Sequence, residues 1–416
     1  MSRIVLTCWG SYGDLFPYLG LAHQLTSLGH TPVVTTCPIY RDVVEAEGLL
    51  FKPLRPDITP EDTAILERVM DPHRGSEVVV REIVAGGVRD AYADTREAAM
   101  GADLIVSHPI TFASPIVADA MKLPWISSVL SPLSFFSAYD FPVMPNMPAA
   151  VHLRRLGPWT GRLLMMMARR VTAPWTAPVR QFRAELGLPP SGDPLYEGQF
   201  SPLGTIAMFS PIFGSPQRDW PARTMATGFS FFNHAIPMPA ELAAFLDAGD
   251  PPVVFTLGTS AVSVAGSFYE ESVTAVAALR RRAVLLVGRD PRNRPSRLPD
   301  GVIAIDSAPH DQLFPRAAAI VHQGGVGTTA QALRSGRPTL VVPHAHDQPD
   351  NAFRVVNLGV GRELYPRRYR APRVAAHLRA LLEDPRYAER AVLVGRQIRA
   401  EDGAARACDV LVAAIR

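Results

Sequence analysis

The chain has 416 residues, of which 47% are apolar and 19% charged, and its formal net charge is +3. The length predicts two or three domains, the composition excludes a disordered chain, and no apolar run approaches the ~20 residues that cross a bilayer. The small charge without a basic block excludes nucleic acid as an expected partner, and three widely spaced cysteines exclude a disulfide framework or a cysteine metal site.

The first 40 residues predict a strand, a glycine-rich turn and a helix. The strand is residues 4–8, the turn is residues 10–14, and the helix runs to about Leu28 and ends at Gly29. Further strands are expected at residues 31–36, 104–106 and 125–129. Strands that alternate with helices predict a parallel sheet covered on both faces.

One stretch, residues 151–180, combines five arginines in its first 20 positions with leucines, methionines and Trp175. We expect a helix whose apolar face packs on the first domain or lines a substrate pocket. A basic amphipathic segment can also lie on a membrane surface, so membrane association is the less favoured alternative.

The same alternation restarts after an aromatic and turn-rich stretch, residues 227–239. Strands are expected at residues 253–257, 283–287, 302–305, 320–322 and 339–342. We therefore predict an α/β protein of two doubly wound parallel-sheet domains, residues 1–226 and 240–399, joined by a linker at 227–239. The segment 387–416 is helical by pattern, and residues 400–416 are expected to return and cap the first domain. Ligands of such sheets bind beyond the carboxyl ends of the strands, which predicts a cleft between the domains.

The strongest chemical signal follows the strand at residues 320–322. There the sequence reads HQGGVGTT and continues into a helix. Glycines let a backbone approach a ligand closely, and the free N–H groups of a helix start attract anions. His322, Gly325, Gly327 and Thr328 are therefore candidate phosphate-binding residues, although Thr328 also suits a helix cap.

Two further loops of the second half carry polar residues beside strand ends. Asp347 and Gln348, in the stretch VVPHAHDQPDN, have the donors and acceptors that suit sugar hydroxyls. Alternatively, Asp347 or Asp350 caps a helix that begins near Asn351, which fits Asp350 better. The stretch TLGTS places small hydroxyl side chains where a distal phosphate would lie, a weak signal by itself.

In the first half, Asp14 follows the first strand and faces the expected cleft. An acceptor hydroxyl must lose its proton as it attacks an anomeric carbon, so a transferase needs a positioned general base. Asp14 is the candidate for that base. The alternative is that Asp14 only caps a helix that starts near Leu15.

Together these motifs resemble the family-1 glycosyltransferases of the GT-B fold over essentially the whole chain, among them bacterial natural-product glycosyltransferases, rhamnosyltransferases and sterol glucosyltransferases. The shared signature stands here as HQGGVGTTAQAL followed by PHAHDQPDNA. The resemblance implies that Asp14 is the catalytic base, at the position where plant members carry a histidine. It implies donor binding by Gly13, Thr259, Ser260, Ala308, His322, Gly325, Gly327, Thr328, Asp347 and Gln348.

Two departures from the plant motif concern the nucleoside. The tryptophan that stacks on uracil is absent from the stretch Ser307–His310, where the backbone of Ala308 is expected to read the base edge. Ala330 stands where the plant motif has a glutamate that binds the ribose hydroxyls. This loss is compatible with deoxyribose and favours a dTDP-sugar slightly over a UDP-sugar.

The predicted function is inverting transfer of a hexose or deoxyhexose from a UDP- or dTDP-sugar to a hydroxyl of a small apolar acceptor such as a flavonoid, polyketide, sterol or lipid. Phe135 and Phe136 are candidate acceptor contacts, with core packing as the alternative. No Asp-x-Asp occurs, so no metal or other cofactor is expected. The alternatives are a nucleotide-sugar epimerase and a non-catalytic helper protein. We expect a soluble, cytoplasmic protein, and the sequence does not indicate its oligomeric state.

Overall fold

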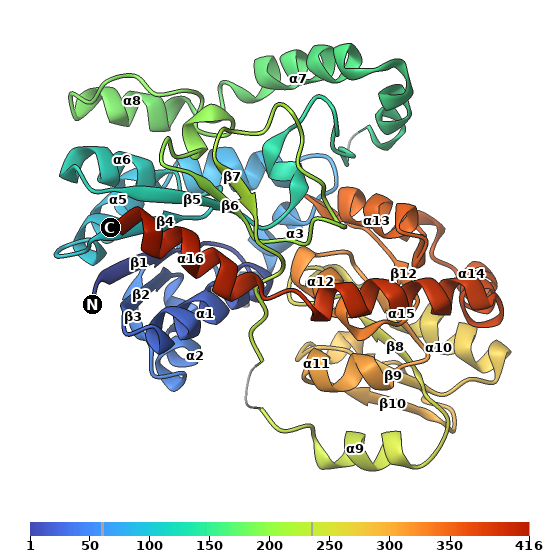
Figure 1. Cartoon of the computed structure of the whole chain (residues 1–416). Coiled ribbons are helices and arrows are strands. Elements are labelled where there is room, and N and C mark those ends of the chain that lie inside the picture. The colour runs from blue at the N-terminus through green and yellow to red at the C-terminus, as the bar shows by residue number, and fades with distance from the viewer. Residues whose placement is uncertain (60–61, 146, 234–235, 416) are drawn as a thin grey trace.

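The computed structural model describes residues 1–59, 62–145, 147–233 and 236–415, which form two parallel β-sheets (Figure 1). The strands of the first sheet are β1 (Arg3–Thr7), β2 (Thr31–Thr36), β3 (Leu50–Pro53), β4 (Leu104–Ser107), β5 (Trp125–Val129), β6 (Thr205–Ala207) and β7 (Thr224–Ala226). The strands of the second sheet are β8 (Val253–Thr256), β9 (Ala283–Leu286), β10 (Val302–Ile305), β11 (Ala319–His322), β12 (Thr339–Val341) and β13 (Gly361–Glu363).

Helices connect most of these strands and cover both faces of each sheet (Figure 1). In the first half they are α1 (Tyr12–Ser27), α2 (Arg41–Ala46), α3 (Thr63–Val69), α4 (Gly75–Glu77), α5 (Val88–Ala98), α6 (Ala113–Met121), α7 (Pro158–Thr172) and α8 (Ala177–Glu185). In the second half they are α9 (Ala240–Asp247), α10 (Phe268–Leu279), α11 (His310–Leu313), α12 (Val326–Ser335), α13 (Gln348–Asn357), α14 (Ala371–Glu383), α15 (Pro385–Arg399) and α16 (Gly403–Ile415).

Both sheets have the doubly wound strand order. The first runs β3-β2-β1-β4-β5-β6-β7 and the second β10-β9-β8-β11-β12-β13, with all pairs parallel. The order reverses between β1 and β4 and between β8 and β11, and such a reversal opens a crevice beyond the carboxyl ends of the two strands. The predicted fold class is therefore confirmed, and each sheet has one crevice in which a ligand can bind.

The chain passes between the two halves at two places that touch each other. A methyl group on Gly403 would lie 2.4 Å from the carbonyl oxygen of Phe229, and Ser210 Oγ donates a hydrogen bond of 2.6 Å to Glu401. Beyond the second passage, α16 packs against α1, and Figure 1 shows these two helices in red and blue. Ala407, Cys408 and Leu411 of α16 belong to the same apolar core as residues of β1 and β4.

The predicted linker and terminal cap correspond to these passages. The described positions of residues 227–239 contain no helix or strand, whereas residues 234–235 lie outside the described residues. The terminal segment is two helices, α15 and α16, and residue 416 also lies outside the described residues.

The arginine-rich segment differs from its prediction. We expected the apolar face of α7 to pack on the first domain or to line a pocket, yet Trp159, Leu163 and Met167 are exposed. The buried side of α7 is instead formed by Thr160, Gly161 and Met165. Among the helices of the described chain, none is both long and apolar enough to cross a bilayer.

Candidate active site

Asp14 stands in the first turn of α1, directly beyond β1. Ser11 is the N-cap of this helix, and Asp14 Oδ2 accepts hydrogen bonds from the Ser11 N–H (2.7 Å) and from Ser11 Oγ (3.1 Å). The helix thus begins at Tyr12 and not near Leu15, and Asp14 belongs to a capping box. The capping hydrogen bonds occupy only Oδ2. Asp14 can therefore cap the helix and still offer Oδ1 as a proton acceptor.

The backbone before Asp14 is shaped to admit its carboxylate. Gly10 has φ +139°, and a methyl group at this position would lie 2.3 Å from Asp14 Oδ2. Only glycine avoids that overlap and adopts this backbone conformation without strain.

His108, which the sequence motifs did not indicate, lies against the other carboxylate oxygen. Its Nε2 is 3.4 Å from Asp14 Oδ1, and its side chain is 7% exposed. Its Nδ1 accepts a hydrogen bond from the Ile110 N–H (3.4 Å), so the neutral ring carries its proton on Nε2, toward Asp14. Because β4 neighbours β1, the residue after β4 and the turn after β1 meet at the crevice of the first sheet.

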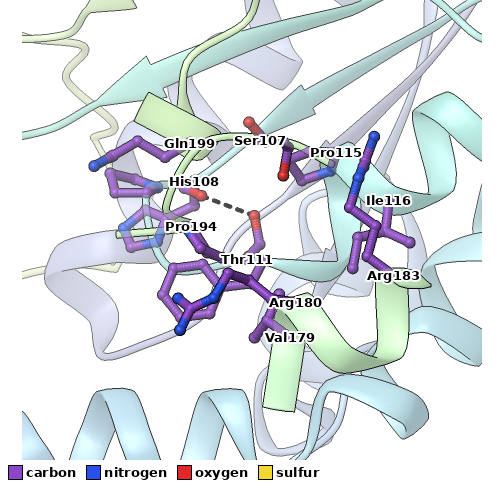
Figure 2. Close-up of a pocket in the computed structure, with 14 residues that line it drawn as sticks. Ser107, His108, Thr111, Pro115, Ile116, Val179, Arg180, Arg183, Pro194 and Gln199 are labelled. Carbon is purple, nitrogen blue, oxygen red and sulfur yellow. Dashed lines mark hydrogen bonds between the residues drawn. The ribbon is translucent and has the colours of Figure 1, made fainter. Parts of the chain in front are cut away.

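A narrow pocket opens beside His108 (Figure 2). One wall is the segment after β4 and the start of α6, and the other is α8 with the following loop. Arg180 and Arg183, which project from α8, are paired with Asp193 and Asp119. The apolar part of the lining is Pro109, Phe112, Pro115, Ile116, Val179 and Pro194.

In the second domain, β11 ends at His322, and the glycine-rich turn leads into α12, whose N-cap is Gly325. The His322 side chain is fully buried, and its Nδ1 accepts a hydrogen bond of 3.0 Å from the Gly324 N–H. Nε2 therefore carries the proton, and it has no hydrogen-bond partner. Burial, reinforced by nearby His310, lowers the pKa of His322 to about 3, so the ring is a neutral donor near pH 7.

The glycine-rich turn also cradles Gln323, which sequence reasoning missed. Methyl groups at Gly258 and Gly325 would lie 2.2 and 2.9 Å from Gln323 Nε2, and this amide donates weakly to Thr328 Oγ1 at 3.4 Å. Gln323 Oε1 is buried without a partner. An unsatisfied buried group of this kind marks a place where a ligand can complete the hydrogen bonding.

Asp347 and Gln348 lie at the start of α13, close to the same turn. Asn351 Nδ2 donates to Asp347 Oδ2 and to the Gly324 carbonyl, both at 2.8 Å, and so ties the two loops together. Burial raises the pKa of Asp347 to about 7, although the Asn351 hydrogen bond opposes the shift. Gln348 Oε1 accepts from the N–H groups of His344 and Ala345 at 2.8 and 3.2 Å, which leaves its amide N–H groups as donors.

The prediction that Asp350 caps this helix is wrong. The helix begins at Gln348, and Asp350 lies inside its first turn, fully buried. Its carboxylate accepts hydrogen bonds from Arg354 Nε (2.7 Å) and from the Val143 N–H (3.0 Å), and Arg354 also forms an ion pair with Asp140 (2.8 Å). This buried ion cluster joins α13 to the loop of residues 137–145 in the first domain.

The two halves of the site meet at a close contact between helix starts. A methyl group on Gly327 would lie 3.1 Å from the Cα of Gly13, so the N-termini of α1 and α12 abut. His346 adds a second contact, because its Nδ1 lies 3.4 Å from Ser76 Oγ. The positive ends of two helix dipoles thus converge at the contact between the domains, and this arrangement favours an anion.

The remaining candidates are less tightly grouped. Thr259 and Ser260 follow β8 and Gly258, the glycine that lies against the Gln323 amide. Ala308 lies in the loop between β10 and α11. Phe135 is a core residue, 7% exposed, with its ring stacked 4.0 Å from that of Trp220. Phe136 packs on Tyr196 and, like Phe135, does not line the pocket beside His108. In the described chain no three His, Cys, Asp or Glu side chains are grouped to hold a metal ion.

Comparison with known proteins shows which family the chain belongs to. Residues 270–413 match the model of the Erythromycin biosynthesis protein CIII-like C-terminal domain. The chain is 32% identical to O-mycaminosyltylonolide 6-deoxyallosyltransferase of Streptomyces fradiae, over 98% of this chain and 96% of that protein. It is 28% identical to sterol 3-beta-glucosyltransferase of Leptosphaeria maculans, over 96% of this chain but only 28% of that longer protein.

Solved structures show the same fold. The crystal structure of glycosyltransferase VinC in complex with DTDP superposes with a TM-score of 0.69 at 22% identity, and the match covers 99% of each chain. The epimerase and helper-protein alternatives find no support in these matches, whose names are those of sugar transferases. The chain is therefore a glycosyltransferase and belongs to the GT-B family that includes the deoxyallosyltransferase of Streptomyces fradiae and the sterol glucosyltransferases.

Proposed function

We propose that this glycosyltransferase moves a hexose or deoxyhexose from a dTDP- or UDP-sugar to a hydroxyl of a small apolar acceptor, with inversion at the anomeric carbon. One observation carries the proposal: Asp14, with His108 beside it, and the turn of His322 face each other across the contact of Gly13 and Gly327. This arrangement supports a base and an anion site on opposite sides of the contact between the two domains.

In this mechanism Asp14 accepts the proton of the acceptor hydroxyl as its oxygen attacks the anomeric carbon. The bond from that carbon to the diphosphate oxygen breaks in the same step, through a transition state of oxocarbenium character. The start of α12 and the Nε2–H of His322 stabilise the charge that the leaving diphosphate gains. His108 positions the carboxylate of Asp14, because its Nε2–H faces Oδ1. These residues require no metal ion for the transfer.

For the donor we propose dTDP-sugar ahead of UDP-sugar. Ala330, on α12, is buried in the apolar core and offers no polar group to a ribose hydroxyl. The similar VinC structure contains DTDP. Gly13, Gly325 and Thr328 would frame the diphosphate, Thr259 and Ser260 its distal phosphate, and Ala308 the base, while Asp347 and Gln348 would hold the sugar.

For the acceptor we propose the pocket beside His108, in place of Phe135. About half of its lining residues are apolar, and the pocket reaches the histidine that contacts Asp14. The three cysteines are buried and free, which supports our proposal of a cytoplasmic enzyme.

A thermal-shift panel with dTDP, UDP, GDP and NAD tests the donor proposal without a known acceptor. A ligand at 100 times its Kd stabilises by about 2.7 kcal/mol, which raises the melting temperature measurably. We expect the largest shift with dTDP. A shift with GDP or NAD alone would contradict the proposed donor class.

Replacing His322 with alanine should weaken binding of the nucleotide-sugar at least ~10-fold, because a hydrogen bond to a charged phosphate is lost. Titration calorimetry with the dTDP-sugar measures this change. His377→Ala is the control and should bind like wild type. His377 lies on α14, where its side chain pairs with Arg362 of β13. An unchanged Kd in His322→Ala would assign His322 a structural role only.

Donor affinity should rise with pH through the neutral range. Sugar hydroxyls donate hydrogen bonds to an ionised Asp347, whose pKa in the free protein is raised to about 7 by burial. Below that pH the carboxyl is protonated and loses acceptor capacity, so the Kd for the dTDP-sugar should increase as the pH falls. Asp347→Asn should bind more weakly at high pH and without this pH dependence. An equal pH dependence in both proteins would contradict the role of Asp347.

A further inference from the structure

The exposed face of α7 carries a stripe of apolar side chains, whereas the exposed face of an ordinary surface helix is polar. Trp159, Leu163, Met167 and Val171 recur at helical spacing and are 59%, 45%, 54% and 65% exposed. In Figure 1 this helix lies along the outer edge of the first domain, on the side away from the second sheet. An apolar stripe of this kind, outside the core, indicates an interaction surface.

The charge around the stripe is strongly one-sided. Residues 141–184 contain seven of the chain's basic side chains and no aspartate or glutamate. The net charge of +3 for the whole chain would be negative without this segment. Arg155 and Arg170 are exposed and form no ion pair in the described chain, and Arg162 contacts only the hydroxyl and ring of Tyr139. A negatively charged partner would therefore find unpaired guanidinium groups beside an apolar stripe.

We propose that α7 docks on a lipid bilayer that contains anionic lipids. The apolar stripe would enter the boundary between head groups and acyl chains, and the arginines would contact lipid phosphates, with Trp159 at the interface. Long arginine side chains reach the head groups while their stems cover apolar surface. Through residues 173–176, α7 leads directly into α8, which lines the pocket beside His108. Docking would thus hold the mouth of that pocket near the membrane surface.

Vesicle flotation tests the proposal with the full chain. We expect the protein to float with vesicles of phosphatidylcholine and phosphatidylglycerol, and at least ~10-fold less with phosphatidylcholine alone. High salt should weaken the binding, because it screens the arginines from the lipid phosphates. Equal flotation with both kinds of vesicle, or none with either, would overturn the proposal.

Two double variants, each with a matched control, test the apolar stripe and the arginines separately. Leu163→Ser with Met167→Ser should reduce binding to the anionic vesicles at least ~10-fold. Val392→Ser with Leu393→Ser, equally exposed on α15, should not. Arg155→Gln with Arg170→Gln should also lose binding, whereas Arg281→Gln with Arg373→Gln, exposed on the second domain, should keep it.

Two further readouts keep the result specific. The shift of melting temperature with dTDP should be unchanged in all four variants, which distinguishes loss of docking from failure of the proposed donor site. Light scattering should give the same mass for wild type and for Leu163→Ser with Met167→Ser. A wild-type dimer that this variant dissociates would assign the stripe to a second copy of the chain and overturn the membrane proposal.

Discussion

Replacing Asp14 with asparagine should slow sugar transfer by ~10²-fold or more, because the attacking hydroxyl loses the group that accepts its proton. The fold should remain intact, since the amide oxygen of asparagine can accept the hydrogen bonds from Ser11 that complete the capping box. Donor affinity should stay within a factor of about two, because most of the proposed diphosphate-binding groups lie on the other domain and the substitution leaves the backbone of Gly13 unchanged. The measurement is the rate at which nucleoside diphosphate is released in the presence of acceptor, together with the Kd of the donor.

Asp42→Asn is the matched control, because it makes the same change in the first turn of the neighbouring helix α2, where the carboxylate is exposed. This variant should turn over at the wild-type rate. Wild-type turnover in Asp14→Asn would instead remove Asp14 as the base and leave it as a helix cap. If transfer and donor binding both collapse, the substitution has disturbed the contact between α1 and α12.

Replacing Asp350 with alanine should destabilise the protein by ~3–5 kcal/mol, the range found when one partner of a buried ion pair is removed. Arg354 is 7% exposed and would keep its charge without its nearest carboxylate. The Val143 N–H would lose its acceptor as well, and with it a link between α13 and the first domain. Urea unfolding followed by tryptophan fluorescence measures the loss, and the transition should move to lower denaturant.

Asp350→Asn is the informative companion variant. Its amide oxygen can still accept a hydrogen bond, so it should lose less stability than Asp350→Ala. Glu45→Ala removes an exposed partner of Arg41 on α2 and should leave the transition unchanged, as exposed ion pairs contribute little. If Asp350→Ala unfolds at the same urea concentration as Glu45→Ala, the buried ion cluster contributes no net stability.

The long apolar strands were predictable because their burial requires continuous runs of β-branched and aliphatic residues. The predicted bounds of β2, β5 and β10 agree with the structure. Those of β4, β8, β9, β11 and β12 differ by one residue at one end, and those of β1 by one residue at both ends. The strands β3, β6, β7 and β13 were missed. They have three or four residues, and sequences such as Gly-Arg-Glu acquire strand geometry only from the neighbour they pair with.

The candidate site shows the same difference between residues that a local motif reveals and residues that only the fold brings together. Asp14, His322 and Asp347 could be predicted as site residues because each stands in a motif whose spacing is specific. His108 carries no such spacing, and only the adjacency of β1 and β4 brings it to Asp14. Phe135 could not be distinguished from a core residue, since the same apolar ring suits both environments. For α7, periodicity predicted an amphipathic helix, but the direction of its apolar face depends on contacts far along the chain.

The return of α16 to the first domain has a consequence for biosynthesis. A ribosome makes β1 and α1 long before Ala407, Cys408 and Leu411, yet all of them share one apolar core. The nascent first domain therefore leaves apolar side chains of α1 exposed throughout the translation of the second domain. The core of the first domain is complete only after α16 has been made.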